Sequence, residues 1–228
     1  MAIRYAGIFA LIAAVVIVPL ALAGAALYYM TAMPGHSHRG SLPPLTAQER
    51  QLAARLRTHV TAIASSEHNV THYQKLEEAA TYVETVRGRD VVAMVSMETI
   101  GYYSDAMGSQ HYPFPFALIY PDKGNFLGFV GTLGSRTLVR RAVASFREHA
   151  SFPSEGVAAP GFIPGVDWSD HWSYGEYGWA AVMITDTALY RYPYYHTADD
   201  TPDKVDYDRL ARVVKGIESV IRELAAKS

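Results

Sequence analysis

The hydrophobic pattern begins with a long apolar segment near the start of the chain. No charged residue occurs between Tyr5 and Met33, and about 20 apolar residues suffice to cross a bilayer as a helix. A secretory signal peptide is the alternative, because Arg4 precedes the segment and Ala21 and Ala23 offer a cleavage site. The apolar run exceeds the roughly 7–15 residues of such a signal, so we predict an uncleaved transmembrane helix over residues 1–33.

The segment that follows, residues 34–45, is rich in Pro, Gly and Ser and predicts a linker. Arg4 and the N-terminal amine, set against Arg39, give a positive-inside bias that favours a cytoplasmic N-terminus. We therefore expect a single-pass membrane protein that contacts the lipid bilayer through residues 5–33. Its C-terminal domain would be extracytoplasmic, either periplasmic or at the cell surface.

Beyond residue 45, helical periodicity alternates with short apolar runs. Thr46 and Glu49 have the spacing of a capping box ahead of a first helix. Further helices are predicted over residues 73–84, over 135–149 and from 207 onward. Strands are predicted over residues 91–97, 125–131 and 180–185, with a short extended stretch at 155–159. Strands that alternate with helices predict an α/β three-layer sandwich with a mostly parallel central sheet. The apolar run at 91–97 is typical of a strand buried on both faces.

Composition narrows the function classes by exclusion. Twenty Lys+Arg against 22 Asp+Glu give a net charge of −2, which creates no long-range field for nucleic acid, so we expect no nucleic-acid partner. The chain has no Cys, which excludes disulfides, thiol nucleophiles and thiolate metal sites. A metal could therefore be held only by carboxylates and imidazoles.

Two residues stand where catalytic or metal-binding groups commonly lie. Glu98 follows the strand at 91–97, and side chains that act in parallel sheets gather just beyond the carboxyl ends of strands. It could be a metal ligand, a general base or a cap for the next loop. His196 lies in an aromatic loop with Asp199 and Asp200 after it, so it could be a metal ligand oriented by a carboxylate or a packed loop histidine. A further polar cluster, Asp-Trp-Ser-Asp-His-Trp at 167–172, includes Ser169, which could cap a helix.

Taken together, these segments resemble the dizinc exopeptidase family that includes bacterial leucyl aminopeptidases, glutamate carboxypeptidase and the transferrin-receptor ectodomain. The likeness is carried by Val-Ser-Met-Glu-Thr-Ile-Gly-Tyr at 95–102, Ser-Asp-His at 169–171 and His-Thr-Ala-Asp-Asp-Thr-Pro-Asp-Lys at 196–204. It implies the phosphorylase/hydrolase-like aminopeptidase fold, two zinc ions and, in intact relatives, removal of N-terminal residues from peptides.

The resemblance implies five protein ligands for the two zinc ions, of which the fourth falls on Glu98 and the fifth on His196. Each would belong to a different metal. It further implies a role at the substrate rim or behind the ligands for a second set of residues. These are Asp170, His171, Tyr192, Tyr194, Tyr195 and Asp200.

The first three metal ligands and the general-base Glu of that family have no counterpart in the chain. No histidine is followed two residues later by Asp, as the family's first ligand requires. The helix at 73–84 runs almost directly into the strand at 91–97, so residues 84–90 mark the junction of an internal deletion. We therefore predict no catalytic residue and an incomplete peptidase-like domain over residues 46–228. The interpretation is a membrane-anchored zinc aminopeptidase-family protein that is inactive and binds zinc poorly; the alternative is a non-catalytic binding or scaffold domain.

Overall fold

The computed structural model describes residues 13–63 and 92–226. The predicted helix over 73–84 and the deletion junction at 84–90 lie outside these residues, as do the first 12 residues of the predicted anchor. The chain divides into two compact units, Met1–Ala32 and Met33–Ser228.

In the first unit a π-helical turn, Ala13–Ile17, leads into helix α2 (Val18–Thr31). The helix ends where the Ala32 amide donates a hydrogen bond to the Tyr28 carbonyl. Within residues 13–63 and 92–226, no helix combines the length and the apolar character needed to span a membrane.

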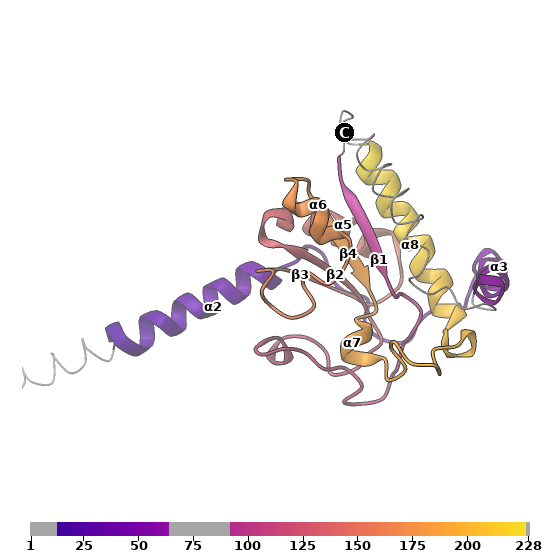
Figure 1. The fold of residues 1–228 in the computed structure, drawn as a ribbon, viewed down its shortest axis with the longest axis horizontal. Coiled ribbons are helices and arrows are strands. Elements are labelled where there is room, and N and C mark those ends of the chain that lie inside the picture. The colour runs from indigo at the N-terminus through magenta and orange to yellow at the C-terminus, as the bar shows by residue number, and fades with distance from the viewer. Residues whose placement is uncertain (1–12, 64–91, 227–228) are drawn as a thin grey trace, which may run out of the picture. The chain divides into compact units, whose positions relative to one another are not determined.

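The second unit is centred on a four-stranded sheet in the order β1-β4-β2-β3 (Figure 1). The strands are β1 (Met94–Glu98), β2 (Leu127–Thr132), β3 (Ser154–Ala159) and β4 (Ala181–Thr185). β1 is parallel to β4 and β2 is parallel to β3, whereas β2 and β4 run antiparallel. These pairings confirm the predicted α/β class with a mostly parallel sheet.

One face of the sheet is covered by α5 (Arg136–His149) and α8 (Tyr207–Ala226). The rings of Phe129 on β2 and Phe146 on α5 meet edge to face, with centroids 5.4 Å apart. Glycines allow the close approach of the elements: a Cβ at Gly131 would lie 2.7 Å from Cγ2 of Val139, and one at Gly216 would lie 2.4 Å from Cε2 of Phe146. The small residues and the aromatic rings therefore interlock in the main hydrophobic core.

Helix α3 (Ala47–Ile63) packs against the first half of α8, at the right of Figure 1. Its predicted capping box is confirmed. The Thr46 amide donates to Oε2 of Glu49 at 2.7 Å, and the Glu49 amide donates to Oγ1 of Thr46 at 3.2 Å. Each residue thus satisfies a backbone donor of the other at the helix start.

The opposite face carries the short helices α6 (His171–Glu176) and α7 (Ala188–Arg191), together with long loops. The hydroxyls of Ser96 on β1 and Ser169 are 2.6 Å apart, which places the segment before α6 on this face. The predicted capping role of Ser169 is wrong, because α6 has Asp170 at its N-cap and no side-chain cap. The pairing with Ser96 occupies the Ser169 hydroxyl instead.

The prediction that the first strand is buried on both faces is also wrong. In β1 only Ser96 is buried, and Met97 is 57% exposed. The strand stands at the end of the order β1-β4-β2-β3, so within the part of the chain that the structure describes only β4 pairs with it. Its continuous apolar sequence therefore does not reflect a central position in this sheet.

The predicted linker at 34–45 belongs to the second unit and is hydrogen-bonded to the rest of it. Arg147 on α5 donates from Nη1 to the carbonyl of Pro34 at 2.8 Å. The hydroxyl of Ser37 accepts from the Ser154 amide at 2.8 Å, and Arg212 on α8 donates to the carbonyl of Pro43. The segment is therefore held against α5, β3 and α8.

Candidate binding pocket and metal-ligand positions

A cavity of about 130 Å³ lies on the loop-covered face of the sheet. The strands supply its floor, and the loops after β1, β3 and β4 supply its walls. Successive residues of β2 face opposite sides of the sheet. The Phe129 side chain points to α5, so Gly128 and Val130 face the opposite side, where they line the cavity. The loop residues that line the cavity are chiefly aromatic and aliphatic: Tyr112, Phe116, Tyr120, Ile163, Val166, Leu189 and Tyr195.

The floor of the cavity contains one row of residues that crosses all four strands. Glu98 pairs with Thr185, Thr185 pairs with Gly128, and Gly128 pairs with Glu155. All four line the cavity. Three steps between neighbouring strands, at roughly 4.8 Å each, put the Cα atoms of Glu98 and Glu155 about 14 Å apart. A carboxylate therefore stands at each end of the row.

One of the two middle positions of this row, Gly128, has no side chain. A Cβ at Gly128 would lie 3.3 Å from the Thr185 carbonyl oxygen and 3.4 Å from Cγ2 of Thr187. A larger residue would extend from this crowded point into the cavity. Gly128 therefore keeps the floor open between the two carboxylates.

The two predicted metal-ligand positions lie next to the same tyrosine. Tyr195 lines the cavity together with Glu98; burial raises the pKa of its hydroxyl, and the charge of Glu98 adds to that rise. The ring of His196 stacks on the Tyr195 ring with centroids 3.9 Å apart, and its backbone has a left-handed φ of 57°. The Glu98 carboxylate thus lines the cavity, whereas the exposed imidazole of His196 lies outside its lining, against the Tyr195 ring.

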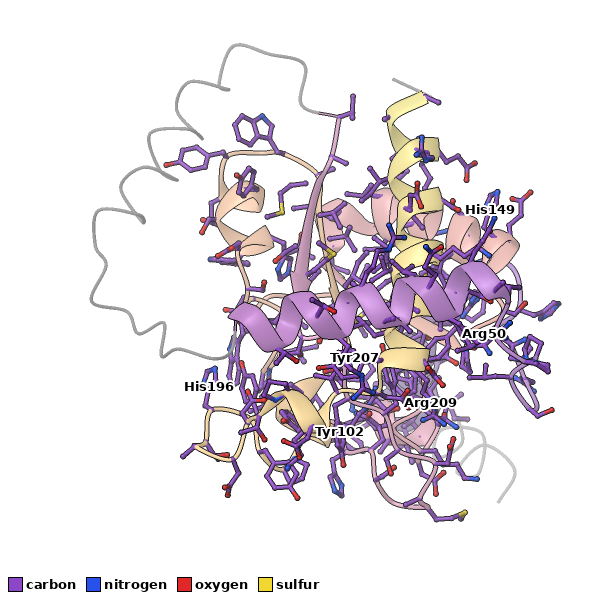
Figure 2. All side chains as sticks on the ribbon, turned by 90° about the vertical axis from the view of Figure 1, so that its right-hand side faces the viewer. Arg50, Tyr102, His149, His196, Tyr207 and Arg209 are labelled. Carbon is purple, nitrogen blue, oxygen red and sulfur yellow. The ribbon has the colours of Figure 1, made fainter. Side chains whose placement is uncertain are left out.

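A zinc site normally takes three or four protein ligands. Across residues 13–63 and 92–226, neither Glu98 nor His196 belongs to a group of three close donors. The group that meets this spacing is Glu148, His149 and Glu223 on α5 and α8, whose donor atoms lie within 4.8 Å of one another. Figure 2 shows His149 and His196 at opposite sides of the domain. The described residues therefore do not complete a zinc site at the pocket.

Asp186, directly after β4, is a buried carboxylate that the sequence analysis missed. It is 1% exposed and accepts hydrogen bonds from the amides of Gly101 and Tyr102, at 2.9 and 2.8 Å, and from the Thr99 hydroxyl at 2.8 Å. Burial raises its pKa in spite of these donors. Asp186 thereby fixes the loop that follows Glu98. Its position after an apolar strand, the same signal that singled out Glu98, could have identified it.

Arg191, at the end of α7, is a second buried charge that the sequence did not reveal. Its Nε donates to Oε1 of Gln110 at 2.8 Å, and its Nη1 donates to the Phe126 carbonyl at 2.9 Å. The guanidinium also lies 4.6 Å from the centroid of the Phe126 ring. Burial lowers its pKa to about 10, while the charge of Asp186 opposes that shift. Arg191 thereby connects two residues that line the pocket, Gln110 and Phe126. No local sequence motif indicates this role.

Asp170 and His171 do not line the cavity. Asp170 is the exposed N-cap residue of α6. His171 is buried, with Nε2 hydrogen-bonded to the Val166 carbonyl at 2.7 Å, and Val166 itself lines the cavity. His171 can therefore support the pocket wall from behind, and a direct role for either residue stays a prediction.

Tyr194 and Asp200 also lie off the cavity, in the loop that carries His196. Asp200 accepts a hydrogen bond from the Tyr192 hydroxyl at 2.7 Å, and the Lys204 ammonium lies 5.1 Å from the Tyr194 ring centroid. These contacts stabilise the conformation of the loop that carries His196. Tyr195 is the predicted rim residue that the structure places in the pocket.

Comparison with known proteins assigns the chain to a family. The model described as peptidase family M28 matches residues 74–221, which is more than half of the chain. The chain is 41% identical over 134 residues to uncharacterized protein YfbL of Escherichia coli (strain K12). The aligned part is 58% of this chain and 42% of the relative, so the chain covers less than half the length of that protein. The chain belongs to peptidase family M28, a metallopeptidase family.

Proposed function

We propose that this chain is a membrane-anchored M28-family protein that binds peptide side chains in its pocket without hydrolysing the peptide. The observation that carries the proposal is that Glu98 borders a formed cavity but not a complete set of zinc ligands. An apolar cavity is built beside it, whereas the described residues add only His196 as a second ligand position for zinc. Hydrolysis in this family relies on zinc to activate water, and it also needs a base to take the proton.

The size of the cavity indicates the kind of side chain it takes. At about 130 Å³ it is close to the engineered cavity of about 150 Å³ that binds benzene. Its walls are aromatic and aliphatic, with Tyr112, Phe116 and Ile163 among them. Burial of one large apolar side chain contributes about 1.5–3 kcal/mol. An aromatic side chain of a peptide is therefore the ligand that fits best.

Peptide hydrolysis and zinc content test the proposal together. We expect well under one tightly held zinc per chain after loading with Zn²⁺ and desalting, and no chelator-sensitive release of amino acids from peptides. Glu98→Gln and His196→Asn should leave the zinc content unchanged, because these two positions alone cannot hold the ion. Nearly two zinc ions per chain, with chelator-sensitive hydrolysis, would overturn the proposal.

Membrane attachment is supported by the uncharged stretch from Tyr5 to Met33. We expect the full chain to stay with the membrane fraction during alkaline carbonate extraction, and a chain that lacks residues 1–33 to be released. An alkaline phosphatase fused at the C-terminus should be active, because that enzyme folds outside the cytoplasm. Release of the full chain by carbonate would contradict the anchor.

The second candidate is a scaffold domain that uses its surface rather than its pocket. Phe114 and Phe162, which are 85% and 86% exposed, favour this alternative because Phe is enriched in protein–protein interfaces relative to the rest of the surface. Binding of N-acetyl-phenylalaninamide separates the candidates. A cooperatively folded chain that leaves this amide unbound would favour the scaffold.

A further inference from the structure

We infer that Glu155 makes the pocket selective for tyrosine over phenylalanine side chains, by accepting a hydrogen bond from the phenolic hydroxyl. This inference rests on the proposed binding function and names the ligand class of the same pocket. Glu155 stands at the end of the floor row farthest from Glu98, on the edge strand β3. A ring that enters the cavity would therefore point one end toward each carboxylate.

The carboxylate of Glu155 lies among aromatic hydroxyls without bonding to them. All three residues, Tyr112, Tyr120 and Glu155, line the cavity, and the charge of Glu155 contributes to the raised pKa values of both tyrosines, behind burial as the main cause. Yet the Tyr120 hydroxyl donates to the Gly156 carbonyl and the Tyr112 hydroxyl donates to the Pro121 carbonyl, each at 2.6 Å. The tyrosines of the wall thus leave the acceptor positions of Glu155 to other donors.

Nη2 of Arg147 lies 3.5 Å from Oε2 of the Glu155 carboxylate, beyond a normal hydrogen-bond distance. The Ser37 hydroxyl and the charge of Arg39 also lower the pKa of Glu155, against the effect of burial. Arg147 directs its donors elsewhere, to the carbonyls of Ser154 and Pro34 at 2.7 and 2.8 Å. Because a carboxylate offers about four lone-pair positions, Glu155 keeps an acceptor for a ligand.

The neighbourhood of Glu155 favours a neutral donor over a cation. The positive charge of Arg147 already balances the carboxylate, and a lysine ammonium would meet that charge after losing its hydration in an apolar cavity. Burial raises the pKa of Glu155, consistent with an enclosed position. A phenol fills the ring-sized space and donates one hydrogen bond without bringing a second charge.

Equilibrium titration of the full chain with three blocked amino acids tests the inference. The probes are N-acetyl-tyrosinamide, N-acetyl-phenylalaninamide and N-acetyl-lysinamide, followed by NMR chemical-shift changes. We expect the tyrosine amide to bind roughly tenfold more tightly than the phenylalanine amide, as a hydrogen bond to a charged acceptor implies. We expect the lysine amide to bind most weakly.

Variants at Glu155 assign the preference to this carboxylate. Glu155→Leu should lower the affinity for the tyrosine amide to that for the phenylalanine amide, and Glu155→Gln should keep part of the preference because an amide oxygen still accepts. Glu148→Leu, at an exposed position on α5, should leave the preference unchanged. Equal affinities in the parent chain, or tightest binding of the lysine amide, would overturn the inference while leaving pocket binding intact. Binding of none of the probes would overturn both.

Discussion

The two faces of the sheet differ in how they are filled. On the α5 and α8 face, the rings of Phe129 and Phe146 pack edge to face, and glycines at 131 and 216 bring the helices within contact. On the other face, loops surround a cavity, and the buried groups Asp186 and Arg191 are held by hydrogen bonds. Close packing stabilises the first face and leaves no space for a ligand. With the proposed function, stability and binding therefore belong to opposite sides of one sheet.

The largest effect should come from truncating the packed face. Phe146→Ala removes a fully buried ring from between β2 and α8, so we expect a loss of about 3–5 kcal/mol in the free energy of unfolding, measured by chemical denaturation. Phe162→Ala removes an 86% exposed ring from the loop-covered face and should change that free energy by less than about 0.5 kcal/mol. Similar losses in the two variants would break the comparison.

A smaller effect is expected from the buried carboxylate of the pocket face. Asp186→Ala leaves the amides of Gly101 and Tyr102 without their acceptor, which should lower the free energy of unfolding by about 1–3 kcal/mol. It should also weaken binding of N-acetyl-phenylalaninamide, because the loop after β1 borders the pocket. Asp200→Ala is the matched control, since that carboxylate is exposed and accepts from the Tyr192 hydroxyl. A loss no larger than that of the control would show that hydrogen bonds do not hold this face.

Much of the fold could be predicted from local patterns. Helices α3, α5 and α8 follow from apolar residues at helical spacing, and the capping box at Thr46 and Glu49 marks the start of the first of these. The edge position of β1 could not be predicted in the same way. Whether a strand lies at the edge or in the centre of a sheet depends on which other strands pair with it. The strand that pairs with β1 is β4, which lies far along the chain. An apolar run indicates a strand but not its number of neighbours.

Of the pocket residues, only those at the end of a predicted strand could be identified from the sequence. Glu98 is the last residue of β1, one position from where the sequence ended the strand, so its place at the carboxyl edge of the sheet could be expected. Glu155 reaches the same cavity through three successive registers, from β1 to β4, to β2 and to β3, and no spacing in the sequence encodes that row. Arg191 binds two residues of the long connection between β1 and β2, Gln110 and Phe126, and has no local signal either.

The smallest expected effect is a difference between the two faces in how the free energy of unfolding depends on pH. Burial lowers the pKa of His171 below its ordinary value of 6.5, outweighing the hydrogen bond to Val166 and the nearby carboxylates. The folded protein therefore binds the proton less readily than the unfolded chain, so this stabilisation is present above pH 6.5 and is lost as the pH falls through the lowered pKa. His171→Gln should flatten the dependence of the unfolding free energy on pH below 6.5, measured by urea denaturation. Phe146→Ala, which removes no titratable group, should keep the slope of the parent at a lower stability. The same slope in His171→Gln as in the parent would assign the pH response to another group and remove this distinction between the faces.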